Sequence, residues 1–100
     1  MQVRLFHQTM RNTQVVGVSF KDNDGNWFEL YFSYDTIVAF HEHGRKMVVS
    51  QNIWSSTTDR HLNEIDNGRK EDRIPYDTFQ EQLDKALEDF FNNSNEEEKG

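Results

Sequence analysis

The segment VVGVSFKDNDGNWFELYFSY, residues 15–34, predicts the architecture of the first half of the chain. Apolar side chains recur at every second position on either side of a polar centre, namely Val16, Val18, Phe20, Phe28, Leu30, Phe32 and Tyr34. A period of two places such residues on one face of a β-strand. The polar centre, residues 22–26, contains an Asp-Gly step that suits the positive φ of a tight turn. We therefore predict an antiparallel β-hairpin.

The same kind of pattern continues in both directions from this hairpin. Residues 2–8 alternate ahead of it, and residues 36–40 and 47–50 form two further apolar runs behind it. The polar turn between these two runs contains Gly44, which can adopt a left-handed conformation. The patterns predict a second hairpin and, in total, an antiparallel meander of four to five strands.

The second half of the chain changes to a helical period. Thr58, Leu62 and Ile65 fall on one helical face, and Gly68 stands where that helix would end. From Asp77 onward, a wider apolar stripe predicts an amphipathic helix of about 15 residues. The stripe consists of Phe79, Leu83, Ala86, Leu87, Phe90 and Phe91. The predicted fold class is α+β, with the sheet packed by a short helix and by a longer C-terminal amphipathic helix.

Length and composition predict a single domain. We assign residues 1–91 to one α+β domain and residues 92–100 to a disordered acidic tail. The chain contains no cysteine, which excludes disulfides and thiolate metal sites. No stretch approaches the roughly 20 apolar residues of a membrane span. We therefore expect a cytoplasmic protein that does not contact a membrane.

The net charge of −7 is concentrated near the C-terminus, where residues 77–100 carry eight acidic and two basic residues. This imbalance disfavours non-specific binding to DNA or to an anionic membrane. An acidic face on the last predicted helix is a candidate binding surface that could imitate a phosphate backbone, although an ordinary solvated helix has the same pattern. Its residues are Asp77, Glu81, Asp84 and Glu88.

Residues 52–65, NIWSSTTDRHLNEI, concentrate hydroxyl, acidic and imidazole side chains. Thr57 and His61 could pair on a helix, but Asp59 lies roughly 200° around the axis from His61 and cannot orient it. A capping box formed by Ser56 and Asp59 explains more of these residues. We therefore predict no catalytic residues, and a small hydrolase or metal-dependent enzyme built on this segment is the third and weakest hypothesis.

Two short motifs suggest metal sites, and neither has the required spacing. Asp22-x-Asp24-x-Asn26 lacks the later Gly and Glu of an EF-hand loop, and its flanks are predicted strands. His41-x-His43 has no third ligand at a spacing typical of zinc. We predict no metal and no cofactor.

The main basic concentration of the chain lies between residues 60 and 73, near the aromatic strands. Basic residues beside aromatic side chains can bind single-stranded nucleic acid, but acidic residues are interleaved with this group. The candidate binding residues of this region are Trp54, Arg60, His61, Asn63, Arg69, Lys70 and Arg73.

Three linked motifs are similar to those of a known family. They are Ser33-Tyr34-x-Thr36-x-Val38-Ala39-Phe40, Val49-Ser50-x-Asn52-x-Trp54-Ser55-x-Thr57-Thr58 and His61-Leu62-Asn63-x-Ile65-Asp66. The pattern covers residues 31–83 and resembles a family of short, function-unknown proteins encoded by bacteriophages and prophages. The resemblance implies a bacterial host cytoplasm and brings no activity with it.

We expect a non-enzymatic phage accessory protein that binds a host or phage protein, with host defence or host nucleic-acid machinery as the target class. The alternative is a small nucleic-acid-binding module that uses the basic loop and sheet aromatics such as Trp27 or Trp54. The sequence leaves open a homodimer, and it does not decide whether Trp54 and His61 are core or surface residues.

Overall fold

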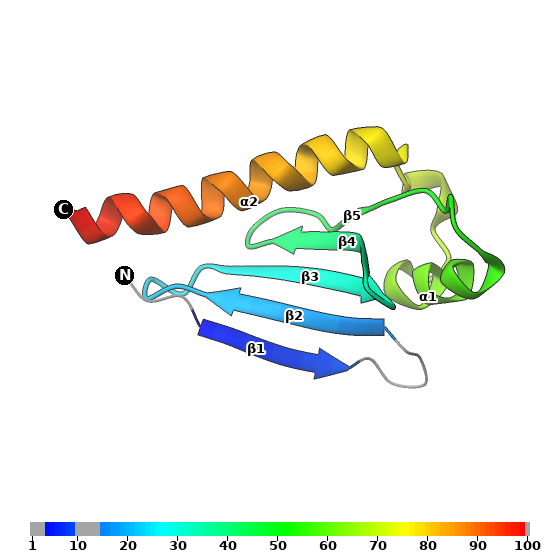
Figure 1. Cartoon of the computed structure of the whole chain (residues 1–100), viewed down its shortest axis with the longest axis horizontal. Helices are drawn as coiled ribbons and strands as arrows, with labels where there is room; N and C mark the ends of the chain where they lie inside the picture. Colours follow the sequence, from blue (N-terminus) through cyan, green and yellow to red (C-terminus); the bar gives the residue numbers. More distant parts are fainter. Residues whose placement is uncertain (1–3, 10–14, 100) are drawn as a thin grey trace.

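The computed structural model describes the backbone of residues 4–9 and 15–99 and the side chains of residues 15–92. Each strand pairs antiparallel with its neighbour in sequence, which gives one five-stranded meander (Figure 1). The strands are β1 (Arg4–Thr9), β2 (Val15–Lys21), β3 (Trp27–Ser33), β4 (Thr36–Glu42) and β5 (Val48–Val49). The helices are α1 (Ser56–Asp66), the short 3₁₀ helix η1 (Lys70–Asp72) and α2 (Tyr76–Lys99). The α+β prediction is confirmed.

The hairpin between β2 and β3 turns on the side chain of Asp22. Its Oδ1 atom accepts hydrogen bonds from the backbone nitrogens of Asp24 and Asn26, at 2.9 and 3.0 Å. Gly25 adopts φ 87°, the left-handed conformation that the Asp-Gly step predicts. The acidic and amide groups that resembled a calcium loop therefore stabilise the turn itself.

One face of the sheet packs against α2. Leu30 lies opposite Val18 on β2 and Phe40 on β4, so these residues share a face. The buried residues between this face and the helix are Phe28, Leu30, Phe40, Phe79, Leu83 and Ala86. Figure 1 shows α2 along the β4–β5 side of the sheet, where its apolar stripe excludes water from the aromatic strands.

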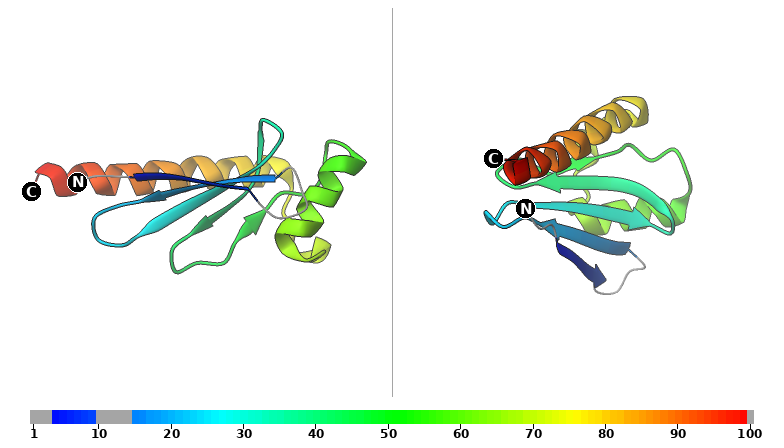
Figure 2. Two further views of the ribbon diagram at one scale, coloured as in Figure 1. Left: turned by 90° about the horizontal axis from the view of Figure 1, so that it is seen from below. Right: turned by 60° about the vertical axis from the view of Figure 1, so that its left-hand side comes forward.

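The opposite face packs against α1 at one end. Tyr31 lies opposite Gly17 and Ala39, one residue out of phase with Leu30, so these side chains point away from α2. The buried residues of this second cluster are Val15, Val38, Ala39, Val49, Leu62 and Ile65. Figure 2 shows the twist of the sheet and the position of α1 at its end. The rest of this face is not covered by α1.

A β-bulge in β4 allows consecutive residues of this strand to contribute to the two buried clusters on opposite faces of the sheet. Tyr31 pairs with Ala39 and Phe32 with Ile37, so Val38 is an extra residue in the ladder. Val38, Ala39 and Phe40 are all buried, although a regular strand would turn alternate side chains to opposite faces. The bulge adds Val38 to the α1 side without removing Phe40 from the α2 side.

The capping box predicted for the first helix is wrong by one residue. Ser55 is the N-cap, with φ −151°, and its Oγ atom accepts a hydrogen bond from the backbone nitrogen of Thr58 at 3.2 Å. Ser56 is the first helical residue and is exposed. At the other end, Asn67 adopts φ 56° immediately before Gly68, so the helix ends where the sequence predicts.

The second helix is longer than the predicted 15 residues. It begins at Tyr76, where the backbone nitrogen of Phe79 donates to the carbonyl of Pro75 at 2.9 Å, and it continues to Lys99. It therefore extends into residues 92–100. The division of the chain into a domain and a disordered tail stays a prediction.

Candidate functional site

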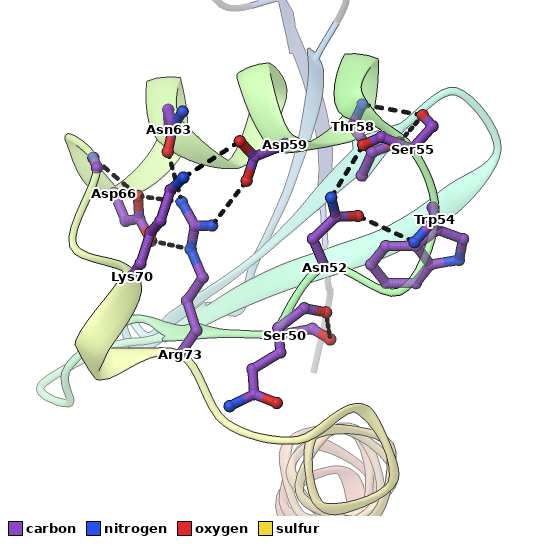
Figure 3. Close-up of polar contacts among 12 residues, drawn as sticks. Ser50, Asn52, Trp54, Ser55, Thr58, Asp59, Asn63, Asp66, Lys70 and Arg73 are labelled. Carbon is purple, nitrogen blue, oxygen red and sulfur yellow. Dashed lines mark hydrogen bonds and ion pairs between the residues drawn. The ribbon is translucent and has the colours of Figure 1, made fainter.

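The guanidinium of Arg73 is buried against α1 (Figure 3). Its Nε and Nη2 atoms donate to both carboxylate oxygens of Asp66, at 2.7 and 3.0 Å. Nη2 also donates to Asn63 at 2.9 Å, and Nη1 donates to Asp59 at 3.3 Å. The hydrogen bond with Asp66 raises the pKa of Arg73 further, so the side chain remains charged although it is only 3% exposed. These contacts hold the segment after η1 against the helix.

The predicted basic loop is therefore not a continuous positive surface. Arg73 donates a hydrogen bond to Asn63 in the interior, and the ammonium of Lys70 lies 3.3 Å from the carboxylate of Asp59. Arg60 and Arg69 are exposed. Two of the four predicted basic residues thus pair with acidic residues of α1.

His61 is also part of the interior. Its Nδ1 atom lies 2.7 Å from the hydroxyl of Ser33, which in turn lies 3.2 Å from the hydroxyl of Thr58. All three residues are buried, and the ring of Tyr34 lies 5.5 Å from the imidazole. Asp59, which helix geometry excludes as an orienting acid for His61, accepts hydrogen bonds from Arg73 and Lys70. The hydroxyl–imidazole pair therefore joins α1 to the end of β3.

Trp54 and the acidic helix face occupy different environments. Trp54 is half-buried against the second buried cluster, which packs beneath α1. Its ring lies 5.4 Å from that of Tyr76 in an edge-on arrangement. It thereby joins the start of α1 to the start of α2. All four residues of the predicted acidic face are exposed on α2, namely Asp77, Glu81, Asp84 and Glu88.

A second group of polar and aromatic side chains lies on the same face of the sheet as α1, beyond the end that this helix covers, and its Tyr31 also packs against the buried cluster beneath α1. Ser19, Glu29 and His41 stand opposite one another on β2, β3 and β4, so they form one row across the sheet. Trp27 and Tyr31 flank Glu29 on the same side of β3. We call this surface the open face, consisting of Ser19, Trp27, Glu29, Tyr31, His41 and His43.

Glu29 is the centre of the open face. Its two carboxylate oxygens accept hydrogen bonds from the hydroxyls of Ser19 and Tyr31, both at 3.2 Å. Burial, together with the neighbouring charge and the hydrogen bond of Glu29, raises the pKa of Tyr31 to about 12. The phenol therefore stays protonated near neutral pH and remains a donor to the carboxylate. These two donors fix the orientation of Glu29.

The two histidines of the His41-x-His43 motif pack around Trp27. The indole lies 4.7 Å from the His41 ring in an edge-on arrangement and 5.3 Å from the His43 ring at 34°. The backbone nitrogen of His43 donates to the carbonyl of Trp27 at 3.0 Å. In the part of the chain that the structure describes, no group of three His, Cys, Asp or Glu side chains is arranged to hold a metal ion.

The family model that matches this chain covers residues 5–81 and is described as a family of unknown function, DUF8033. The chain belongs to the DUF8033 family. Membership confirms the prediction of a function-unknown family. No curated protein and no solved structure matches the chain.

The DUF8033 match includes both the open face and the Arg73 contacts, whereas most of α2 lies beyond it. Among the described residues, no helix has the length and apolar character needed to cross a membrane.

The sequence analysis does not identify the open face, because its residues belong to separate motifs. Trp27, Glu29 and Tyr31 alternate with the apolar positions of β3, which was a usable signal for a polar face. The position of His41 opposite Glu29 depends on the strand register, and the bulge at Val38 shifts that register. The pattern of β4 alone does not predict this shift.

Proposed function

We propose that this protein is a non-enzymatic binding protein that contacts another protein through its open face. The observation that carries the proposal is a difference in exposure between the open face and the other polar contacts of the molecule. The Arg73 and His61 contacts are buried within the molecule, whereas Glu29 and His41 remain about one-quarter exposed beside the half-buried Trp27. Trp and Tyr are frequent energetic centres of protein interfaces because they bury large areas with few rotatable bonds.

The setting of this binding is part of the proposal. The motifs over residues 31–83 resemble those of proteins encoded by bacteriophages and prophages, so the partner would be a host or phage protein in the bacterial cytoplasm. Host defence or host nucleic-acid machinery is the target class that this setting favours. Binding of such a partner to the open face would require no catalytic activity of this protein.

Nucleic acid is the alternative partner, and the charges near β5 support it less well. Two grooves flank the β4–β5 hairpin, with volumes of about 580 and 490 Å³. The charged residues of the first are Glu42, Arg45, Lys46, Lys85 and Asp89. Those of the second are Lys46, Asp66, Arg69 and Asp72. Acidic residues accompany the basic ones in both grooves, so neither offers the uninterrupted positive surface that phosphate binding favours.

Affinity capture from host lysate tests the proposal, with matched variants of the full chain. Replacing Trp27 by alanine should abolish recovery of the bound protein, because the variant removes the largest ring of the open face. Ile53→Ala is the control, since Ile53 is 59% exposed and lies outside that face. Equal recovery by both variants would contradict the proposal. Recovery of nucleic acid in place of protein, lost at moderate salt, would favour the alternative.

A further inference from the structure

The open face contains two facing groups, Nδ1 of His41 and Oε1 of Glu29, which we call the acceptor pair. The Nε2 atom of His41 lies 2.7 Å from the carbonyl oxygen of Arg45, and this nitrogen must be the donor because a carbonyl can only accept. In a neutral imidazole the other nitrogen, Nδ1, then carries a lone pair. The Nδ1 atom lies 3.7 Å from Oε1 of Glu29, which is also an acceptor.

A hydrogen donor or a positive charge placed between or beside two such acceptors would form favourable contacts with both. An ammonium or guanidinium group of a partner would supply both the positive charge and the hydrogen bonds. Among the side chains that the structure describes, no lysine or arginine forms an ion pair with Glu29.

The surroundings of the acceptor pair suit a basic side chain. Ser19 and Tyr31 hold the carboxylate in place and leave part of its hydrogen-bonding capacity unused, because an ionised carboxylate can accept about four hydrogen bonds. The indole of Trp27 is in contact with His41, and an aromatic ring attracts a cation electrostatically. The net charge of −7 would also draw a cationic partner toward the molecule.

We propose that the open face receives a lysine or arginine side chain of the partner protein, with Glu29 and His41 as its acceptors and Trp27 as the adjacent aromatic ring. This inference rests on the proposed protein-binding function and specifies the chemistry of the residue that the partner contributes. Arginine suits the site best, because its planar guanidinium can donate to two acceptors and stack on an aromatic ring at once.

The site can be tested with a small probe before any partner is known. Nα-acetyl-arginine N-methylamide, titrated into the full-length protein, should shift the NMR signals of the Trp27 indole and the His41 ring, with a dissociation constant on the order of millimolar. The citrulline analogue has nearly the same shape without the charge and should produce no saturable shift. Equal responses to the two probes, or no saturable response to arginine, would overturn the inference.

Glu29→Gln supplies the matched variant. The glutamine keeps the shape and a carbonyl acceptor, and its amide can donate to His41, so we expect the arginine probe to bind about tenfold or more weakly. Glu42→Gln removes one charge from β4 outside the open face and should leave probe binding unchanged. Unaltered amide spectra of both variants would show that the fold is intact, and comparable weakening by both would contradict the proposed site.

The capture experiment separates this inference from the proposed function. If a partner binds in a Trp27-dependent manner but Glu29→Gln retains it fully, the partner does not use the acceptor pair and the inference fails while the function stands. If the arginine probe binds as described but no protein is captured by the wild type, the site stands and the proposed function fails.

Discussion

Arg73 illustrates how a residue that resembles a binding group in the sequence can be required for folding. A buried guanidinium is stable only while carboxylates and hydrogen-bond acceptors compensate for its lost hydration. Asp66 provides the bidentate contact, and Asn63 and Asp59 provide the other acceptors. The spacing of these residues in the sequence gives no indication that they converge, because the chain must first turn at Asn67 and Gly68.

Removal of the Asp66 charge should therefore destabilise the protein strongly. Asp66→Asn leaves Arg73 buried with a weaker partner, and we expect a loss of about 3–5 kcal/mol in the free energy of unfolding. Urea denaturation followed by circular dichroism measures the change. Asp72→Asn is the control, because Asp72 is an exposed acid of η1. A loss no larger than that of the control would mean that the Arg73 contacts contribute little to stability.

The elements differ in how far the sequence predicts them. The β2–β3 hairpin and the C-terminal helix follow from local periodicity and turn chemistry, and both are found in the structure. The N-cap was misplaced by one residue because Ser55 and Ser56 have equal capping propensity, and only the packing of α1 selects between them. The bulge at Val38 depends on contacts with both helices, so no local pattern in β4 predicts it.

The assignment of the N-cap can be tested with two neighbouring substitutions. Ser55→Ala removes the oxygen that accepts the backbone hydrogen bond of Thr58 and should cost about 1 kcal/mol of stability. Ser56→Ala should change stability by less than about 0.5 kcal/mol, because its side chain is exposed at the first helical position. Thermal and urea denaturation of the pair gives both values. A larger loss for Ser56→Ala would restore the capping box predicted from the sequence.

At the scale of the whole molecule, the two helices share the sheet unequally. The second helix covers one side of the aromatic strands, and the first covers only one end of the other side. This unequal coverage creates the open face, and it could not be predicted from residues 15–34 because those residues do not specify where α1 docks. The molecule thus presents two candidate surfaces, the open face and the acidic face of α2.

Site-specific photo-crosslinking compares the two surfaces most directly. A photoreactive amino acid at His43, which is exposed at the edge of the open face, should form a covalent adduct with the partner protein in host lysate. The same group at Glu81, exposed on α2, should form none. An adduct at His43 that disappears in the Trp27→Ala background is the result we predict. An adduct formed only at Glu81 would contradict the assignment of binding to the open face.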